Sequence, residues 1–213
     1  MMEVPGVQSK NIELIGYCDF PDKGGGNELA GQTVGNRRYL YHGHLWAGGT
    51  SIIDVTDPAN SVVVNFIPSS NKDTWGIKVR VADDIMILPC ESAFFIPTTD
   101  HKRAAKGIRI FDVRDPLEPR ELAFWECGGD GVHRSWWNGD RYAYLTVGQS
   151  GVKGAVQNGV EGKTKYVSTL DISDPANPQE VSKFWLPGQR GEPDGVVKWK
   201  PGDSIYPHGP PMV

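Results

Sequence analysis

The chain has 213 residues and a formal net charge of −4 at pH 7, from 22 lysines and arginines against 26 aspartates and glutamates. It has no basic tract, which argues against a nucleic-acid or anionic-membrane partner because such surfaces need clustered Lys and Arg. No stretch approaches the roughly 20 apolar residues of a membrane span. The first residues lack the basic and apolar regions of a signal peptide, and the three cysteines show no metal-type spacing. We therefore expect a soluble, cytoplasmic protein.

Three segments share one pattern, an apolar strand that ends at Asp-Val or Asp-Ile and then turns through Asp-Pro. These segments are residues 51–60, 108–119 and 167–178. Their first aspartates follow one another at intervals of 58 and 59 residues, at Asp54, Asp112 and Asp171. The aspartate before each proline is expected to accept hydrogen bonds from nearby backbone N–H groups, while proline presets φ for the turn. These turn aspartates are Asp57, Asp115 and Asp174.

Further strands are predicted around each segment. One follows each turn, at residues 62–67, 121–126 and 181–186, and two more precede each segment. In the third repeat the preceding pair is 133–137 and 141–147, and Asn138-Gly139 between apolar runs is a strong hairpin signal. In the second repeat the pair is 77–81 and 85–88. Units of four short antiparallel strands predict an all-β fold, a β-propeller of four-stranded antiparallel blades. The predicted blades are residues 28–68, 74–127 and 131–187.

The apolar strand followed by Asp-Pro-Ala-Asn, at residues 51–60 and 167–178, resembles the LVIVD repeat. This repeat is found in many largely uncharacterised bacterial β-propeller proteins. The resemblance covers roughly residues 11–213 and implies the propeller fold and a bacterial source. It says almost nothing about activity, because a fold does not imply a function.

Two further segments are predicted at the ends of the sequence. Residues 11–18 are similar to residues 120–125 and are expected to be an orphan outer strand, and residues 205–213 look like the start of a further blade. Three blades are fewer than the usual four to eight, so the ring is expected to be incomplete in one chain. Either C-terminal blades are missing, or two chains assemble into a closed ring as a homo-oligomer. The sequence stops just inside a segment that looks like the start of a strand, and this favours missing C-terminal blades.

Histidines recur where the inner strands begin, closest to the predicted propeller axis. Read in register, these positions are Ala30, Gly76, His133 and His208. Converging imidazoles would make a transition-metal site for Fe, Cu, Mn or Zn, with His133 and His208 as ligands. His44 and Glu91, at the ends of the next strands, are weaker candidates. The alternative is that each histidine only bonds backbone carbonyls where its blade begins.

Two long connections, residues 90–106 and 148–165, are predicted on the same face as the histidines. Loops of this length are often functional when a rigid scaffold positions them. Trp75 is a candidate for substrate binding beside them, and Arg134 could bind an anionic substrate with two hydrogen bonds. The alternatives are core packing for Trp75 and an ion pair between blades for Arg134.

The sequence supports two functions. The first is a metal-dependent enzyme that acts on a small organic molecule at the loop-rich face. The second is a non-catalytic binding or scaffold propeller for a protein partner. The chain has no Gly-Xaa-Ser-Xaa-Gly elbow, P-loop or dinucleotide fingerprint, so no catalytic residue can be assigned from a motif.

Overall fold

The computed structural model describes residues 10–93, 96–152, 155–157, 160–186 and 206–210. Within these residues the protein is all-β, with antiparallel strands and one short 3₁₀ turn, η1 (Pro58–Asn60). The strands are β1 (Gly26–Val34), β2 (Arg37–His44), β3 (Gly49–Asp54), β4 (Val62–Pro68), β5 (Thr74–Trp75), β6 (Arg80–Ala82), β7 (Ile85–Ser92), β8 (Gly107–Asp112), β9 (Arg120–Glu126), β10 (Gly131–Trp136), β11 (Tyr142–Gln149), β12 (Val156–Gln157), β13 (Val160–Glu161), β14 (Thr164–Asp171) and β15 (Gln179–Phe184). No helix in this part of the chain is long and apolar enough to cross a membrane.

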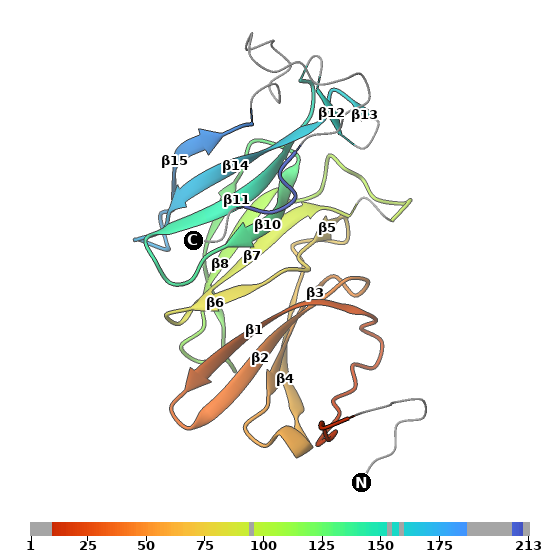
Figure 1. Cartoon of the computed structure of the whole chain (residues 1–213), viewed down its shortest axis with the longest axis vertical. Coiled ribbons are helices and arrows are strands. Elements are labelled where there is room, and N and C mark those ends of the chain that lie inside the picture. The colour runs from red at the N-terminus through yellow and green to blue at the C-terminus, as the bar shows by residue number, and fades with distance from the viewer. Residues whose placement is uncertain (1–9, 94–95, 153–154, 158–159, 187–205, 211–213) are drawn as a thin grey trace.

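The strands form two main sheets (Figure 1). The first repeat makes a four-stranded sheet in the order β1-β2-β3-β4. The second and third repeats share a curled nine-stranded sheet with the path β15-β14-β11-β10-β7-β8-β9, and β5 and β6 pair with β7. The second and third units were expected to be separate four-stranded sheets. They are joined instead because β10 meets β7 at the single residue pair Gly131 and Glu91.

The two main core clusters lie on opposite sides of β7. Met86 and Leu88 pack with Tyr41 of β2 in a cluster that joins the first repeat to the second. Ile87 packs with Leu145 of β11 in a cluster that joins the second repeat to the third. All five side chains are at most 2% exposed. Because successive side chains of a strand point to opposite faces, one apolar strand can serve both clusters.

The turn chemistry predicted for the repeats is confirmed. In each repeat the aspartate before the proline accepts a hydrogen bond at Oδ1 from the backbone N–H two residues later. The donors are Ala59 for Asp57 (3.1 Å), Leu117 for Asp115 (2.9 Å) and Ala176 for Asp174 (3.1 Å). The proline presets the backbone and the carboxylate caps it, so the hairpin turn is encoded locally.

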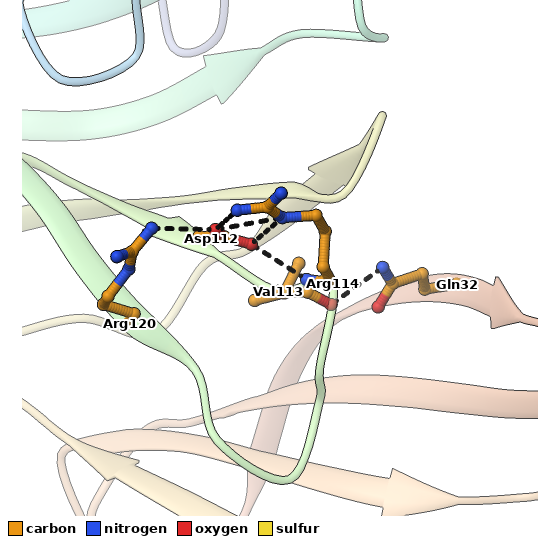
Figure 2. Close-up of polar contacts among 5 residues, drawn as sticks. All are labelled: Gln32, Asp112, Val113, Arg114 and Arg120. Carbon is orange, nitrogen blue, oxygen red and sulfur yellow. Dashed lines mark hydrogen bonds and ion pairs between the residues drawn. The ribbon is translucent and has the colours of Figure 1, made fainter.

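The first aspartate of the second repeat lies at a junction between sheets (Figure 2). Asp112 pairs with Arg114 (2.5 Å) and Arg120 (3.2 Å), and these contacts hold the pKa of its carboxyl well below the usual range, chiefly through the Arg114 hydrogen bonds. Next to it, the Gln32 side chain of β1 donates from Nε2 to the Val113 carbonyl at 3.0 Å. This hydrogen bond ties the first sheet to the second.

The predicted strand at residues 77–81 is interrupted. Between β5 and β6 the chain leaves β7, and the Val79 N–H donates to the Glu28 carboxylate at 3.2 Å instead of to a neighbouring strand. Gly43 of β2 lies directly against the Ile77 carbonyl, where an added Cβ would be 2.0 Å from that oxygen. The close approach of the first sheet thus diverts this segment, and it carries Lys78 into the interior, where Lys78 is 4% exposed.

Both end segments differ from the expected strands. Residues 11–18 form no strand, and Gly16 packs against the Pro58 carbonyl of the first turn. Of residues 205–213, the structure describes 206–210, which form no strand and lie beside β10 (Figure 1). The predicted loop at residues 148–165 contains the small hairpin β12–β13 within its described part.

Candidate functional site

A cavity of about 780 Å³ lies where the second and third repeats meet. It is lined by the segment between β5 and β6, the end of β7, β10, the start of β14 and residues 206–210. Five of the six sequence-predicted site residues line it, among them His133, His208, Glu91 and Arg134. Trp75, the predicted substrate-binding aromatic, is also in its wall and is 3% exposed.

The backbone of β10 explains why His133 faces this cavity. The pairing of β10 with β11 shifts between Val132 and Arg134, so His133 sits at a β-bulge. Bulges redirect side chains and are common beside active sites. One step earlier, Gly131 has a positive φ of 119° and leaves so little space that a Cβ there would be 2.5 Å from the Glu91 Cα. A glycine is therefore needed for β10 to approach β7 closely.

His133, Glu91 and His208 form a hydrogen-bonded chain. The Nδ1 of His133 is 2.7 Å from Glu91 Oε1, and its Nε2 is 3.1 Å from the Nε2 of His208. Because an ionised carboxylate only accepts, Nδ1 of His133 carries the proton and donates to Glu91. In a neutral His133 ring, Nε2 is then an acceptor, and His208 donates its Nε2–H. Glu91 thus orients His133 with a basic nitrogen toward the cavity.

Both histidines are held in the neutral form. Burial lowers the pKa of His133, although the bond to Glu91 works in the opposite direction. The pKa of His208 is lowered by burial and by the charge of Arg134. The side chain of His133 is 14% exposed and that of Glu91 is 11% exposed, so solvent screens their interaction only weakly.

Two lysines that sequence reasoning missed complete the site. Lys78 is 4% exposed, and its Nζ lies 3.7 Å from Glu91 Oε1. Lys165, the second residue of β14, is 8% exposed, and its Nζ lies 5.2 Å from the centre of the Tyr206 ring. Burial lowers the pKa of both lysines, to about 8 for Lys165. Among the described residues, Lys165 Nζ has no ion pair or hydrogen bond.

One of the two lysines carried a usable signal in the sequence. Lys78 stands between Ile77 and Val79 in an apolar run, where the predicted strand would have placed its charge on one face of a buried sheet. Lys165 follows Gly162, Lys163 and Thr164 in a polar stretch and reads as an exposed loop residue. Only the packing of β14 beside β11 shows that it is buried.

His44, the remaining predicted metal ligand, does not line the cavity. It is fully buried, and its Nε2 lies 2.8 Å from Ser51 Oγ. Its ring packs near those of Phe20, His42 and Phe66 at centroid distances of 4.8–6.1 Å. His42 and His44 are two residues apart and share a face of β2, and the segment that contains Phe20 covers that face.

The donors at the cavity fall short of a complete metal site. No group of three or more His, Cys, Asp or Glu side chains that could hold a metal ion occurs within the described ranges. His133 and His208 supply two nitrogens, while Glu91 is engaged with the far nitrogen of His133. No family model matches this sequence, and no curated protein matches it either.

Proposed function

We propose that the cavity binds a small organic anion and that His133, oriented by Glu91, acts on it as a general base. We further propose that the three repeats are blades of an LVIVD-type β-propeller. The support for the blades is the matching turn chemistry and the hairpin order within each repeat. The cavity would then lie where two neighbouring blades meet, close to the propeller axis.

The observation that carries the anion site is the excess of positive charge in this one cavity. The chain as a whole has a net charge of −4, yet five cationic side chains line the cavity against two carboxylates, Glu91 and Asp130. The cations are Lys78, Lys106, Arg134, Lys163 and Lys165. A buried charge lowers stability unless it is paired. An anionic ligand would supply the missing partner for Lys165 and for the buried Nε of Arg134, which has no hydrogen-bond partner among the described residues.

The wall of the cavity indicates the rest of the ligand. Trp75 and Ile77 are both buried at its edge and pack with the half-buried Leu45. Binding sites for small molecules are typically apolar with a few convergent polar groups. A carboxylate with a short apolar chain matches this combination.

The role of His133 follows from its geometry. Its Nε2 is the acceptor nitrogen and accepts the His208 Nε2–H, and a proton-donating group of the ligand would take the place of that donor. The carboxylate on Nδ1 stabilises the imidazolium that forms when Nε2 takes a proton. The nearby cations would stabilise negative charge that develops on the ligand at the same moment. Proton abstraction next to a carboxylate or carbonyl group is the reaction class that fits.

Isothermal titration calorimetry with α-hydroxyisocaproate, and with isoamyl alcohol as its uncharged counterpart, tests the anion site. We expect the acid to bind and the alcohol to bind at least tenfold more weakly. Arg134→Met should weaken binding of the acid by roughly 10- to 100-fold, because a charge-assisted hydrogen bond contributes about 1.5–3 kcal/mol. Lys72→Met, at an exposed lysine outside the cavity, is the matched control. Equal affinity for acid and alcohol would contradict the proposal.

A transition-metal site at His133 and His208 is the second candidate function. Its support is the 3.1 Å separation of the two Nε2 atoms, together with the bond from His133 Nδ1 to Glu91. Metal-bound histidines usually make such a bond with their other nitrogen. The positive charges of Lys78, Arg134 and Lys165, which act on His208, oppose a divalent ion electrostatically. Native mass spectrometry of the purified chain, with and without added Zn²⁺, Fe²⁺, Mn²⁺ or Cu²⁺, tests this metal site. A stoichiometric metal ion that is lost in the His208→Ala variant would support it.

A further inference from the structure

We propose that Lys165 forms a covalent imine with the carbonyl group of a 2-oxo carboxylic acid bound in this cavity. This inference rests on the proposed anion site, and it adds a nucleophile and a substrate class. The geometry that points to it is a buried primary amine with no ion pair or hydrogen bond among the described residues, in the same cavity as a guanidinium and a histidine–carboxylate pair.

Lys165 and Lys78 are both buried in this cavity but differ in their surroundings. The ammonium group of Lys78 faces a carboxylate, since its Nζ is 3.7 Å from Glu91 Oε1. Lys165 has no hydrogen bond or ion pair among the described residues; its Nζ lies 5.2 Å from the centre of the Tyr206 ring, and the charge of Glu91 acts on it without direct contact. An ion pair stabilises the protonated form of a lysine and holds its nitrogen against the carboxylate, whereas an amine without an ion pair can react. Lys165 is therefore the better nucleophile of the two.

A lysine reacts with a carbonyl group only through its neutral amine. Burial lowers the pKa of Lys165 to about 8 against the opposing charge of Glu91, and the charges of Lys78 and Arg134 add to the lowering, so about a tenth of the amine is neutral at pH 7. Desolvation and a neighbouring cation are the two known ways to activate a lysine for imine formation. Here both act on the same residue.

The reaction balances without any redox partner. The amine nitrogen attacks the carbonyl carbon and forms the C–N bond as the C=O π bond breaks, and the nitrogen passes its first proton through His133 Nε2 to the carbonyl oxygen, which becomes a hydroxyl group. The nitrogen then loses a proton to His133 Nε2, which returns it to the hydroxyl group as water leaves. The products are an imine and one water molecule. His133 can serve in both directions because Glu91 holds its ring in one orientation.

The neighbouring groups select for a carboxylate next to the carbonyl. Arg134 follows His133 on β10, and its guanidinium can hold a carboxylate with two parallel hydrogen bonds. The positive charge that an imine gains on protonation would then face the carboxylate of its own ligand. A simple ketone or aldehyde lacks that anion, so it would leave Arg134 without a partner.

Trapping with borohydride tests the imine directly. The chain is incubated with α-ketoisocaproate, reduced with sodium borohydride and analysed by intact-mass and peptide-mapping mass spectrometry. We expect one adduct per chain on Lys165, heavier than the free protein by the mass of the acid less its carbonyl oxygen. In Lys165→Arg, which keeps the positive charge, the adduct should fall at least tenfold, while Lys72→Arg should match the unmodified protein.

Calorimetry with α-hydroxyisocaproate, which has no carbonyl group, separates this inference from the proposed function. If the hydroxy acid binds but the keto acid gives no adduct, the imine is refuted and the anion site stands. If the adduct maps to Lys78 or to exposed lysines, the assignment to Lys165 is refuted. If the hydroxy acid does not bind and no adduct forms, both proposals fall. Mapping the unmodified protein keeps the test valid even if the variant misfolds.

Discussion

Replacing Lys165 by methionine removes a buried charge while keeping an unbranched side chain of similar length. The pKa of Lys165 falls from an ordinary 10.5 to about 8, chiefly because the ammonium group is buried; the charge of Glu91 opposes this shift, and the charges of Lys78 and Arg134 add to it. At about 1.4 kcal/mol for each pH unit, the protonated lysine lowers the stability of the folded protein by about 3 kcal/mol. We therefore expect Lys165→Met to raise the free energy of unfolding at pH 7 by up to that amount.

The effect of Lys165 on the free energy of unfolding depends on pH. Below pH 8 the lysine is protonated in both the folded and the unfolded chain, so the full destabilisation is present. Between pH 8 and 10.5 the unfolded chain binds more protons than the folded one, and stability due to this group rises with pH. Above pH 10.5 the effect is gone. The stability gap between Lys165→Met and the unmodified protein should therefore shrink across this window.

Urea unfolding followed by tryptophan fluorescence, in a buffer free of phosphate and carboxylates, measures the gap at each pH. For a chain of this size, about 2–4 °C per kcal/mol also predicts a melting temperature roughly 6–12 °C higher for the variant. Lys72→Met, at an exposed site, should change neither quantity. A Lys165→Met variant that is less stable at pH 7, or a gap that stays constant from pH 8 to 10.5, would refute the reasoning.

Three further predictions address the scaffold and the site. Ile108→Ala, in the cluster between the second and third repeats, should lower the free energy of unfolding by about 2–5 kcal/mol in urea titrations, because the surrounding residues cannot fill the cavity. Gly43→Ala should lower it by about 1–3 kcal/mol, since its Cβ would collide with a backbone carbonyl. Gly31→Ala, whose Cβ meets nothing closer than 3.9 Å, should change the free energy of unfolding little. An equal loss of stability in both variants would contradict the close contact between Gly43 and the Ile77 carbonyl. Glu91→Gln should lower the pKa of His133 further in an NMR titration, because the carboxylate raises it; an unchanged pKa would mean that the two side chains do not interact.

The sequence by itself determined the local structure of the repeats. The Asp-Pro turns form as predicted because the carboxylate and proline act on the backbone within two residues. Tyr39 and Tyr41 alternate along the sequence as the buried residues of a strand do, and both are at most 4% exposed on β2. Tyr142 and Tyr144 follow the same pattern but are only half-buried, because periodicity identifies a face of a strand and not what covers it.

Only the tertiary structure decided which side chains share a cavity. His133 and His208 were expected together, and their Nε2 atoms lie 3.1 Å apart. His44 was assigned to the same site from its position at the end of a strand, but it lies in a separate aromatic cluster. The charged wall of the cavity depends on Lys78 and Lys165, which are 87 residues apart in the sequence. Neither residue is marked by a motif. Their burial results from the diverted segment between β5 and β6 and from the packing of β14, and such long-range contacts leave no periodic trace in the sequence.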